Sequence, residues 1–379
     1  MPLLKYGTRN KVIYYTQDDY ESDNLSNFWR YDVASNGQIT LQEYLGTSTR
    51  ISVPKKNGLT VIERGVSNGP FYNNQDMVSI KLSGVPWANN DMSSVFYNCV
   101  NLTSVSGINE SVTNLFETFS YCFNLNQNIQ IPNSVTNMHG TFYSCFNFNQ
   151  NIQIPNSVTS MNRTFLYCRR LNQNIQIPNS VTSMVGVFQG CYNLNQNIQI
   201  PNSVTDMRET FYLCSGLNQQ IQIPNSVRDM YSTFSNCTNL NQNIQIPNSV
   251  VNMIDTFYNC TKLNQNIQIP NSVTNMFMTF YRCSNLNQNI QIPNFVTSMY
   301  GTFQGCSALT GRINILSKEI IDARKCFNGT SLPKDVYIPY NYANNERTKT
   351  FNSFVTAGYL DSSGVSTGIN GATMRDLNA

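Results

Sequence analysis

The chain has 379 residues, of which only 12% are charged, and its formal net charge at pH 7 is +3. So small a charge creates no strong field to gather nucleic acid or anionic lipid, and no apolar run approaches the roughly 18 residues of a membrane span. The composition therefore argues against a nucleic-acid partner and against a membrane partner.

The N-terminal part divides into two predicted regions. Residues 1–37 lack the uninterrupted apolar core of a secretory signal, so we expect a soluble chain that does not use the general export route. This segment is predicted to be a cap or an attachment piece. Residues 38–101 are predicted to be diverged lead-in coils of a repeat array, because Met92, Phe96 and Cys99 already follow the spacing of the later repeats.

A 23-residue unit dominates the centre of the chain. Taken from Leu125 it reads LNQNIQIPNSVTNMHGTFYSCFN, and further copies start at Phe148, Leu171, Leu194, Leu217, Leu240, Leu263 and Leu286. A unit this short cannot bury its apolar residues alone, so neighbouring coils must stack and share one core. We predict an α/β repeat solenoid, a right-handed leucine-rich-repeat array over residues 102–339 with short parallel strands, short helical segments and diverged caps.

Two local periods occur within each unit. The alternation Ile-Gln-Ile at residues 129–131 predicts a short strand with one buried face, which Pro132 ends by removing a backbone donor. Met138, Phe142 and Cys145 have the spacing i, i+4, i+7, which predicts one or two helical turns with these side chains inward.

The C-terminal part departs gradually from the repeat. Leu332, Val336 and Ile338 begin another copy, whereas Cys326 is displaced from its expected position, so the array is predicted to end near Pro339. Residues 340–379 are predicted to be a C-terminal cap or docking segment. It contains TKTFNSFVTAGYL, an amphipathic helix closed by Gly358, and then a glycine-rich, hairpin-like tail.

Ten of the eleven cysteines recur every 23 residues, from Cys99 to Cys306. A disulfide framework or a metal site is one interpretation of so many cysteines. Even spacing with one cysteine per coil instead favours a small core residue, because it does not place four ligands around one ion.

The asparagine and glutamine residues Asn126, Gln127 and Asn128 also recur in register. They are predicted to form amide ladders along the stack that satisfy backbone groups at the turns. Ligand binding is the alternative.

Catalytic motifs are missing from the sequence. The chain has one histidine, His139, and contains no GxxxxGK[ST] phosphate loop, no HExxH and no CxxC pair. We therefore expect a protein that is not an enzyme and that needs no cofactor and no metal.

Differences between the copies concentrate at offsets 14, 15, 18, 19, 21 and 22 from the first residue of the unit. These offsets flank the inward Met, Phe and Cys, so their side chains are predicted to point outward. Tyrosine and arginine are common there, and both dominate binding hot spots. The alternative explanation of these differences is neutral drift after duplication, in which the aromatic rings only cover the edges of the hydrophobic core. The candidate ligand-binding strip comprises Tyr143, Tyr167, Arg169, Arg170, Tyr192, Arg208, Tyr212, Tyr231, Tyr258, Tyr281, Arg282 and Tyr300.

The unit pattern FxxCxxLxxxIxIPxSVTxM resembles the BspA-type leucine-rich repeat, and its Met variant resembles repeats of mycoplasma-like surface lipoproteins. The resemblance covers roughly residues 38–339, and the lead-in at residues 37–61 is similar to the first coil of such proteins. The segment TFNSFVTAGYL with a closing RDL resembles tail or head fibre proteins of gut bacteriophages. The family resemblance implies a surface protein used in adhesion.

From these features we expect a bacteriophage virion protein, a tail or head fibre made in the host cytoplasm, that binds a host surface molecule such as a polysaccharide. Its termini are expected to contact other virion proteins, and a homo-oligomer such as a trimer is compatible with this role. One alternative is a structural decoration or spacer protein of the virion. The other is an adhesin of the bacterial cell surface.

Overall fold

The computed structural model divides the chain into two compact units, Met1–Val181 and Thr182–Ala379, and each is described by itself. The N-terminal residues are described in short stretches and the repeats without a break. The described residues are 11–15, 27–33, 35, 39–44, 49–53, 59–62, 70–82, 84–330, 334–339, 348–362, 366–367 and 372–376.

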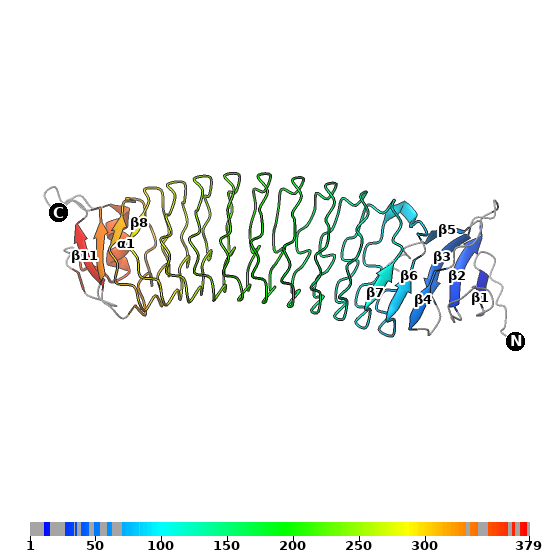
Figure 1. The fold of residues 1–379 in the computed structure, drawn as a ribbon. Helices are drawn as coiled ribbons and strands as arrows, with labels where there is room; N and C mark the ends of the chain where they lie inside the picture. The colour runs from blue at the N-terminus through cyan, green and yellow to red at the C-terminus, as the bar shows by residue number, and fades with distance from the viewer. Residues whose placement is uncertain are drawn as a thin grey trace. The chain divides into compact units, whose positions relative to one another are not determined.

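The first unit begins with a four-stranded sheet of order β1-β2-β3-β5 (Figure 1). Its strands are β1 (Lys11–Tyr15), β2 (Asn27–Val33), β3 (Ile39–Tyr44) and β5 (Leu59–Ile62). β1 pairs antiparallel with β2 and β2 antiparallel with β3, whereas β3 pairs parallel with β5. The change to parallel pairing at β3 and β5 marks the start of solenoid topology.

The first coils of the solenoid are joined by a second, three-stranded parallel sheet. It has the order β4-β6-β7, with β4 at Arg50–Ser52, β6 at Ser79–Lys81 and β7 at Ser104–Ser106. A short 3-10 helix, η2 (Ala88–Asn90), follows β6. Parallel strands on consecutive coils are the arrangement that the lead-in segment predicted.

In the repeats, coils are joined through the segment that follows the strand position. Bridges at offset 12 connect consecutive coils, for example Asn114 to Asn137 and Asn137 to Ser160 in the first unit. Beyond this bridge, alternate N–H groups donate to the next coil, as Phe142 N does to Thr164 O at 2.9 Å.

The predicted helical segments are turns. The N–H groups between the inter-coil donors donate to the carbonyl three residues earlier, as Cys145 N does to Phe142 O at 3.0 Å. Residues at offsets 15 and 19 have left-handed backbones, as in Gly140 with φ 60° and Ser144 with φ 58°. An α-helix needs each N–H to reach the carbonyl four residues back, so a segment whose alternate donors leave the coil cannot be helical. The inward stripe of Met, Phe and Cys is nevertheless confirmed.

The Ile-Gln-Ile segments keep their predicted facing but mostly lack regular strand pairing. Ile129 is 2% and Ile131 9% exposed, so both face the core. Strands at this position occur only toward the C-terminus among the described repeats, as β8 (Ile290–Ile292) and β9 (Ile313–Ile315). The inter-coil backbone bonds of the other repeats lie on the turn side instead.

The core is a set of ladders in which each side chain contacts its counterpart in the next coil. Phenylalanine rings stack at centroid distances of 5.6 Å between Phe119 and Phe142 and 5.7 Å between Phe234 and Phe257. All eleven cysteines are buried and unbridged, and repeat thiols donate to a carbonyl of the preceding coil, as Cys145 Sγ does to Phe119 O at 3.1 Å. The interpretation of the cysteines as core residues is confirmed.

The predicted amide ladder is present at offset 1. Asn241 Oδ1 accepts hydrogen bonds from the backbone N of Asn264 at 2.9 Å and from Gln265 Nε2 at 3.2 Å, and the same pair of bonds links Asn126 to Asn149 and Gln150. These side chains satisfy the backbone of the neighbouring coil, which confirms their structural role.

The second unit ends in a four-stranded parallel sheet of order β11-β10-β9-β8 (Figure 1), in which β10 is Lys334–Ile338 and β11 is Ala372–Asp376. The tail was expected to form a hairpin, and the parallel sheet was expected to end near Pro339. β11 instead pairs parallel with β10, because the chain makes one more turn through α1 before it returns.

The predicted amphipathic helix is confirmed as α1 (Lys349–Thr356). Thr348 caps its N-terminus by accepting from Phe351 N, and Gly358 follows its end with φ 82°. Phe354 and Tyr359 pack against Phe327, the last ring of the phenylalanine ladder, at 6.4 and 5.4 Å. The C-terminal segment thus covers the end of the core in this unit.

Candidate functional site

The candidate strip lies on the turns of the coils. We call the side chains at offsets 14, 15, 18, 19, 21 and 22 the turn face. Offsets 15 and 19 have positive φ in coil after coil, and bulky residues occupy several of them, including Tyr167 (φ 57°), Leu213 (φ 63°) and Arg282 (φ 56°). Such residues rarely adopt this conformation, so the stacked backbone imposes it on them.

In the second unit, the structure brings several predicted residues together. Tyr258 and Tyr281 stack at 4.6 Å with an interplanar angle of 9°, and the guanidinium of Arg282 lies 5.3 Å from the ring centre of Tyr281. Tyr300 stacks on Phe277 at 5.0 Å. The tyrosines are half-buried, because neighbouring rings cover part of their faces.

Other predicted residues of this unit lie further along the same turns. Tyr192, Tyr212 and Tyr231 are half-buried. Arg208 is exposed and forms an ion pair with Asp206, in which Nη2 and Oδ2 are 2.7 Å apart. This pairing with a residue of its own coil holds the guanidinium close to the turn.

In the first unit, Tyr143 lies 4.9 Å from Tyr121 and 6.3 Å from Tyr167. Arg169 and Arg170 are exposed, and the guanidinium of Arg169 lies 4.1 Å from the ring centre of Phe146. These rings also contact one another, so their edges and hydroxyl groups rather than their faces are presented outward.

Two acidic groups on the turn face have unusual environments. Burial raises the pKa of Asp255 from 3.8 to about 6, and its Oδ1 atom has no hydrogen-bond partner among the residues that the structure describes. Burial likewise raises the pKa of Glu117. Burial disfavours the ionised form of both carboxyl groups, so each keeps its proton to a higher pH than an exposed carboxyl group does.

Two polar groups near Glu117 also have shifted pKa values. A hydrogen bond to Tyr121 raises the pKa of Tyr143 to about 12, with burial as a further cause. Burial and the charge of Arg163 lower the pKa of His139, whose ring stacks on Phe116 at 5.1 Å. His139 is therefore a packed aromatic residue.

Some turn-face residues were missed by the sequence analysis. Tyr97, Tyr121 and Phe123 extend the aromatic rows into the diverged coils. Tyr121 and Phe123 lie at offsets 19 and 21 from Leu102, so the same repeat spacing could have found them. The burial of Asp255 had no signal in the sequence, because it depends on how closely the coils approach each other.

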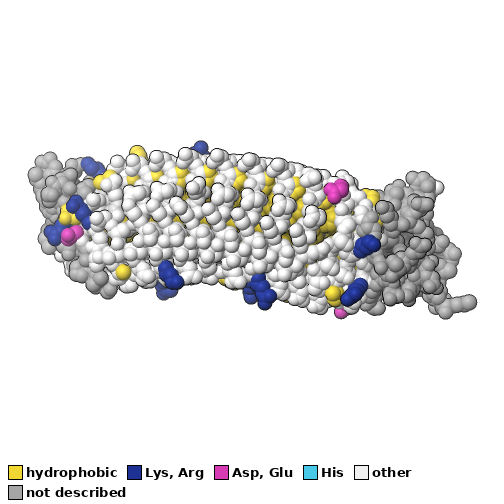
Figure 2. All heavy atoms as spheres, in the orientation of Figure 1, with side chains coloured by type: hydrophobic (Ala, Val, Ile, Leu, Met, Phe, Trp, Pro, Cys, Tyr) yellow, Lys and Arg dark blue, Asp and Glu magenta, His cyan; other side chains and the backbone are white. Residues whose placement is uncertain are grey.

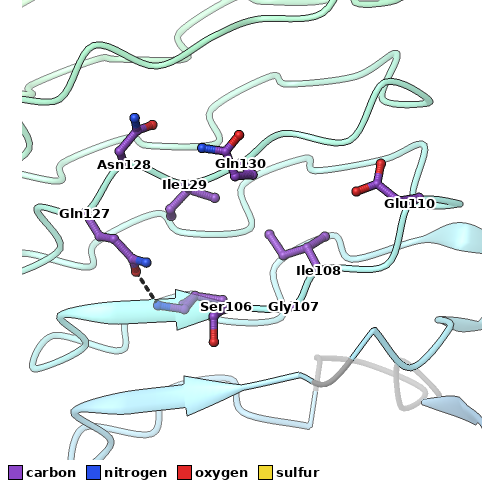
Figure 3. Close-up of a pocket in the computed structure, with 9 residues that line it drawn as sticks. Ser106, Gly107, Ile108, Glu110, Gln127, Asn128, Ile129 and Gln130 are labelled. Atoms are coloured by element: carbon purple, nitrogen blue, oxygen red, sulfur yellow. Dashed lines mark hydrogen bonds between the residues drawn. The ribbon is translucent and has the colours of Figure 1, made fainter.

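A shallow cleft of about 230 Å³ lies in the first unit where the coil after β7 begins (Figure 3). Val105 N donates to Gln127 Oε1 at 2.7 Å at its edge. Ile108, Asn128 and Gln130 are among its lining residues, so its wall is mostly neutral and amide-rich.

No cluster of three potential metal ligands occurs among the described residues. Within the same residues, no helix has the length and hydropathy to cross a bilayer. Burial raises the pKa of Cys99 to about 12 and also raises the pKa values of Cys122 and Cys145, so burial favours the protonated thiol at these positions.

Comparisons with known proteins bear on this architecture. A sequence family described as "Mycoplasma protein of unknown function, DUF285" matches residues 90–200, 155–246, 183–291 and 229–337, which together span more than half of the chain. The chain belongs to this DUF285 family. A comparison with curated proteins gives no match.

Two solved structures share the fold of this DUF285 protein. A leucine-rich repeat protein from Bacteroides ovatus is 24% identical with a TM-score of 0.65, covering 84% of this chain and 85% of its own. A leucine-rich cell surface protein from Faecalibacterium prausnitzii is 23% identical with a TM-score of 0.56, covering 86% and 98%. The resemblance to BspA-type leucine-rich repeats and the parallel-strand solenoid are thus both confirmed.

Proposed function

We propose that this DUF285 protein is a non-enzymatic binding protein of the adhesion type, which presents its turn face to a surface molecule. The observation that carries the proposal is the turn face itself, where a repeated scaffold holds side chains that differ from coil to coil. Tyr258, Tyr281 and Arg282 form one contiguous group on it. Aromatic and arginine side chains on rigid supports bind with little loss of conformational entropy.

Binding by ring stacking on the strip finds less support than binding by ring edges, hydroxyls and guanidinium groups. Tyr258 and Tyr281 already stack on each other, so a ligand does not reach the faces between them. A protein or glycan surface with complementary hydrogen-bonding groups suits this arrangement.

The setting of the adhesion is also a proposal. Display on a bacteriophage virion is supported by the resemblance of TFNSFVTAGYL to fibre proteins, with the termini joining other virion proteins and a trimer as one assembly. Display on a bacterial cell is supported by the structural likeness to a protein described as a leucine-rich cell surface protein. Antibody labelling of purified virions and of intact cells from the source culture separates the two settings.

The adhesion proposal is tested by binding fluorescent full-length protein to cells from the native habitat. We expect saturable attachment that falls at least about tenfold on combining Tyr258→Ala with Tyr281→Ala. A matched control replaces Thr205 and Thr297, which are exposed at offset 11 and lie outside the turn face, with alanine. Attachment that does not saturate, or that survives the tyrosine changes, contradicts the proposal, and a spacer protein is the expected alternative in that case.

A further inference from the structure

The side of the coils that carries the Ile-Gln-Ile segment presents a second regular surface. In the second unit, side chains at offsets 3, 5 and 8 of the coils starting at Leu194 through Leu286 are exposed amides, and we call them the amide face. Its central row consists of Gln199, Gln222, Gln245, Gln268 and Gln291. Figure 2 shows a face with much neutral polar surface, rows of apolar side chains and few charges.

Apart from Asn289, whose Oδ1 accepts from Arg312 N at 2.8 Å, the amides of this face do not have the structural role found at offset 1. Gln245 Nε2 donates to Asn243 Oδ1 of its own coil at 2.9 Å, and no hydrogen bond joins glutamines of neighbouring coils within the described part of this unit. The exposed asparagines at offset 8, such as Asn248, have no side-chain hydrogen bond among these residues. Donors and acceptors therefore remain available along the whole row.

Comparison of the copies within this chain separates the amide face from the turn face. Offset 5 is glutamine and offset 8 is asparagine in all eight copies from Leu125 to Leu286, although both positions are exposed. Offset 14 on the turns has diverged in the same copies, as at the exposed Arg208 and the half-buried Tyr231 and Phe277. Drift after duplication acts on both faces alike, so it does not account for amides that stay unchanged without a structural bond.

One departure from the repeat lies beside this row. Phe295 replaces the serine of the other copies and is 64% exposed, directly after Asn294 of the amide face. In several other coils that serine hydroxyl donates to a valine carbonyl of the preceding coil, as Ser226 does to Val204 O and Ser272 to Val250 O, at 2.6 and 2.5 Å. The copy with Phe295 gives up this bond and presents an aromatic ring to solvent, which is unfavourable unless a partner covers the ring.

From these observations we propose that the amide face with Phe295 binds a neutral, extended polysaccharide. Amides donate and accept hydrogen bonds as sugar hydroxyls do, and the absence of charge at offsets 3, 5 and 8 suits an uncharged polymer. The stacked rings of Phe234 and Phe257 in neighbouring coils are 5.7 Å apart, which is comparable to the length of one pyranose unit. The exposed ring offers a platform for the C–H face of a sugar.

The side chains between the amide rows fit the same ligand. Ile200 and Ile246, at offset 6, are partly exposed between the glutamine and asparagine rows. Alternating amide and apolar rows match the hydroxyl edges and the C–H faces of a sugar ring. In the first unit, Asn128 and Gln130 occupy offsets 3 and 5 and line the cleft of Figure 3. The equivalent amides of that coil therefore lie in a depression.

The test is affinity electrophoresis of the full-length protein in gels containing galactomannan, with dextran and heparin as flexible and anionic comparisons. We expect galactomannan to retard the native protein and the two comparison polymers to leave its mobility unchanged. Combining Gln222→Ala, Gln245→Ala and Gln268→Ala is expected to weaken retardation at least tenfold. The matched control replaces three exposed side chains outside both faces by Thr182→Ala, Thr205→Ala and Thr297→Ala and is expected to bind as the native protein does.

Phe295→Ser provides a second variant. A loss of binding in it would not come from a folding defect, because the introduced hydroxyl restores the serine of the repeat and its bond to the Val273 carbonyl. We expect unchanged or higher thermal stability together with at least a fivefold loss of galactomannan binding. The proposal is overturned if galactomannan does not retard the native protein, if the triple glutamine variant binds as well as the native protein, or if heparin competes equally. Self-association that disappears in the same variant would assign the face to a second copy instead. Cell attachment through the turn face is measured separately, so either proposal can fail alone.

Discussion

Asp255 is the turn-face residue whose environment gives the sharpest quantitative expectation. Its backbone has φ 52°, its Oδ1 lacks a hydrogen-bond partner among the described residues, and burial raises its pKa from 3.8 to about 6. At about 1.4 kcal/mol per pH unit, this rise sets an upper limit near 3 kcal/mol on the destabilisation by the carboxylate. Because the side chain is only half-buried, solvent screening reduces the expected effect to about 1 kcal/mol.

The direction of the pH dependence follows from the raised pKa. The neutral acid is favoured in the folded protein, so its contribution to stability is complete below pH 3.8 and is lost as the pH rises through about 6. Asp255→Asn is therefore expected to stabilise the protein by about 1 kcal/mol at pH 7 and to have almost no effect near pH 4. Urea unfolding followed by circular dichroism at the two pH values measures the difference.

A control separates this effect from a general change in net charge. Glu110→Gln removes one charge at an exposed position and is expected to change stability by less than about 0.5 kcal/mol at either pH. If Asp255→Asn destabilises the protein at pH 7, the carboxylate has a favourable partner and the argument from burial is wrong. A stabilisation of equal size at pH 4 and pH 7 would point to relief of backbone strain instead.

Three further outcomes test the packing. The eleven buried cysteines are expected to resist a thiol reagent at pH 8 in the folded protein and all to react in urea, and rapid labelling of the native chain would show that the ladder opens. Gly311→Ala is expected to lower the melting temperature clearly, since a Cβ there would lie 2.1 Å from the carbonyl oxygen of Gln288, and an unchanged melting temperature would contradict this close approach. Phe234→Ala, in the middle of a stack with 5.6 and 5.7 Å spacings, is expected to cost about 3–5 kcal/mol in urea unfolding, and a loss below 1 kcal/mol would refute the shared core.

The fold could be predicted from the sequence to the extent that burial follows the repeat. The 23-residue period placed Leu125, Val135, Met138, Phe142 and Cys145 in the core, and all five are 0% exposed. The local conformation was harder to predict, because spacing i, i+4, i+7 suits a helix and a run of turns equally well. The glycines at offsets 15 and 19 of some copies were the available signal for left-handed positions.

The candidate site could be predicted only as a set of outward positions. Repeat spacing correctly placed Tyr258 and Tyr281 on one face, but their mutual stacking depends on the distance between coils on the turn side. The unpartnered carboxyl of Asp255 depends on the same distance. Propensity and pattern describe a single chain segment, whereas both features arise only when neighbouring coils are in place.

Turn positions with a positive φ help to distinguish side chains that selection maintains from side chains that changed by neutral drift. Offset 19 carries glycine or asparagine in several coils, as in Gly190, Asn236 and Asn259, and these residues tolerate a positive φ with little strain. Tyr167 and Arg282 occupy the same position although a bulky side chain there costs about 1 kcal/mol or more. Drift limited by stability would favour the unstrained residues, so the coils that keep a large side chain at this offset are where a function of the turn face should be sought first.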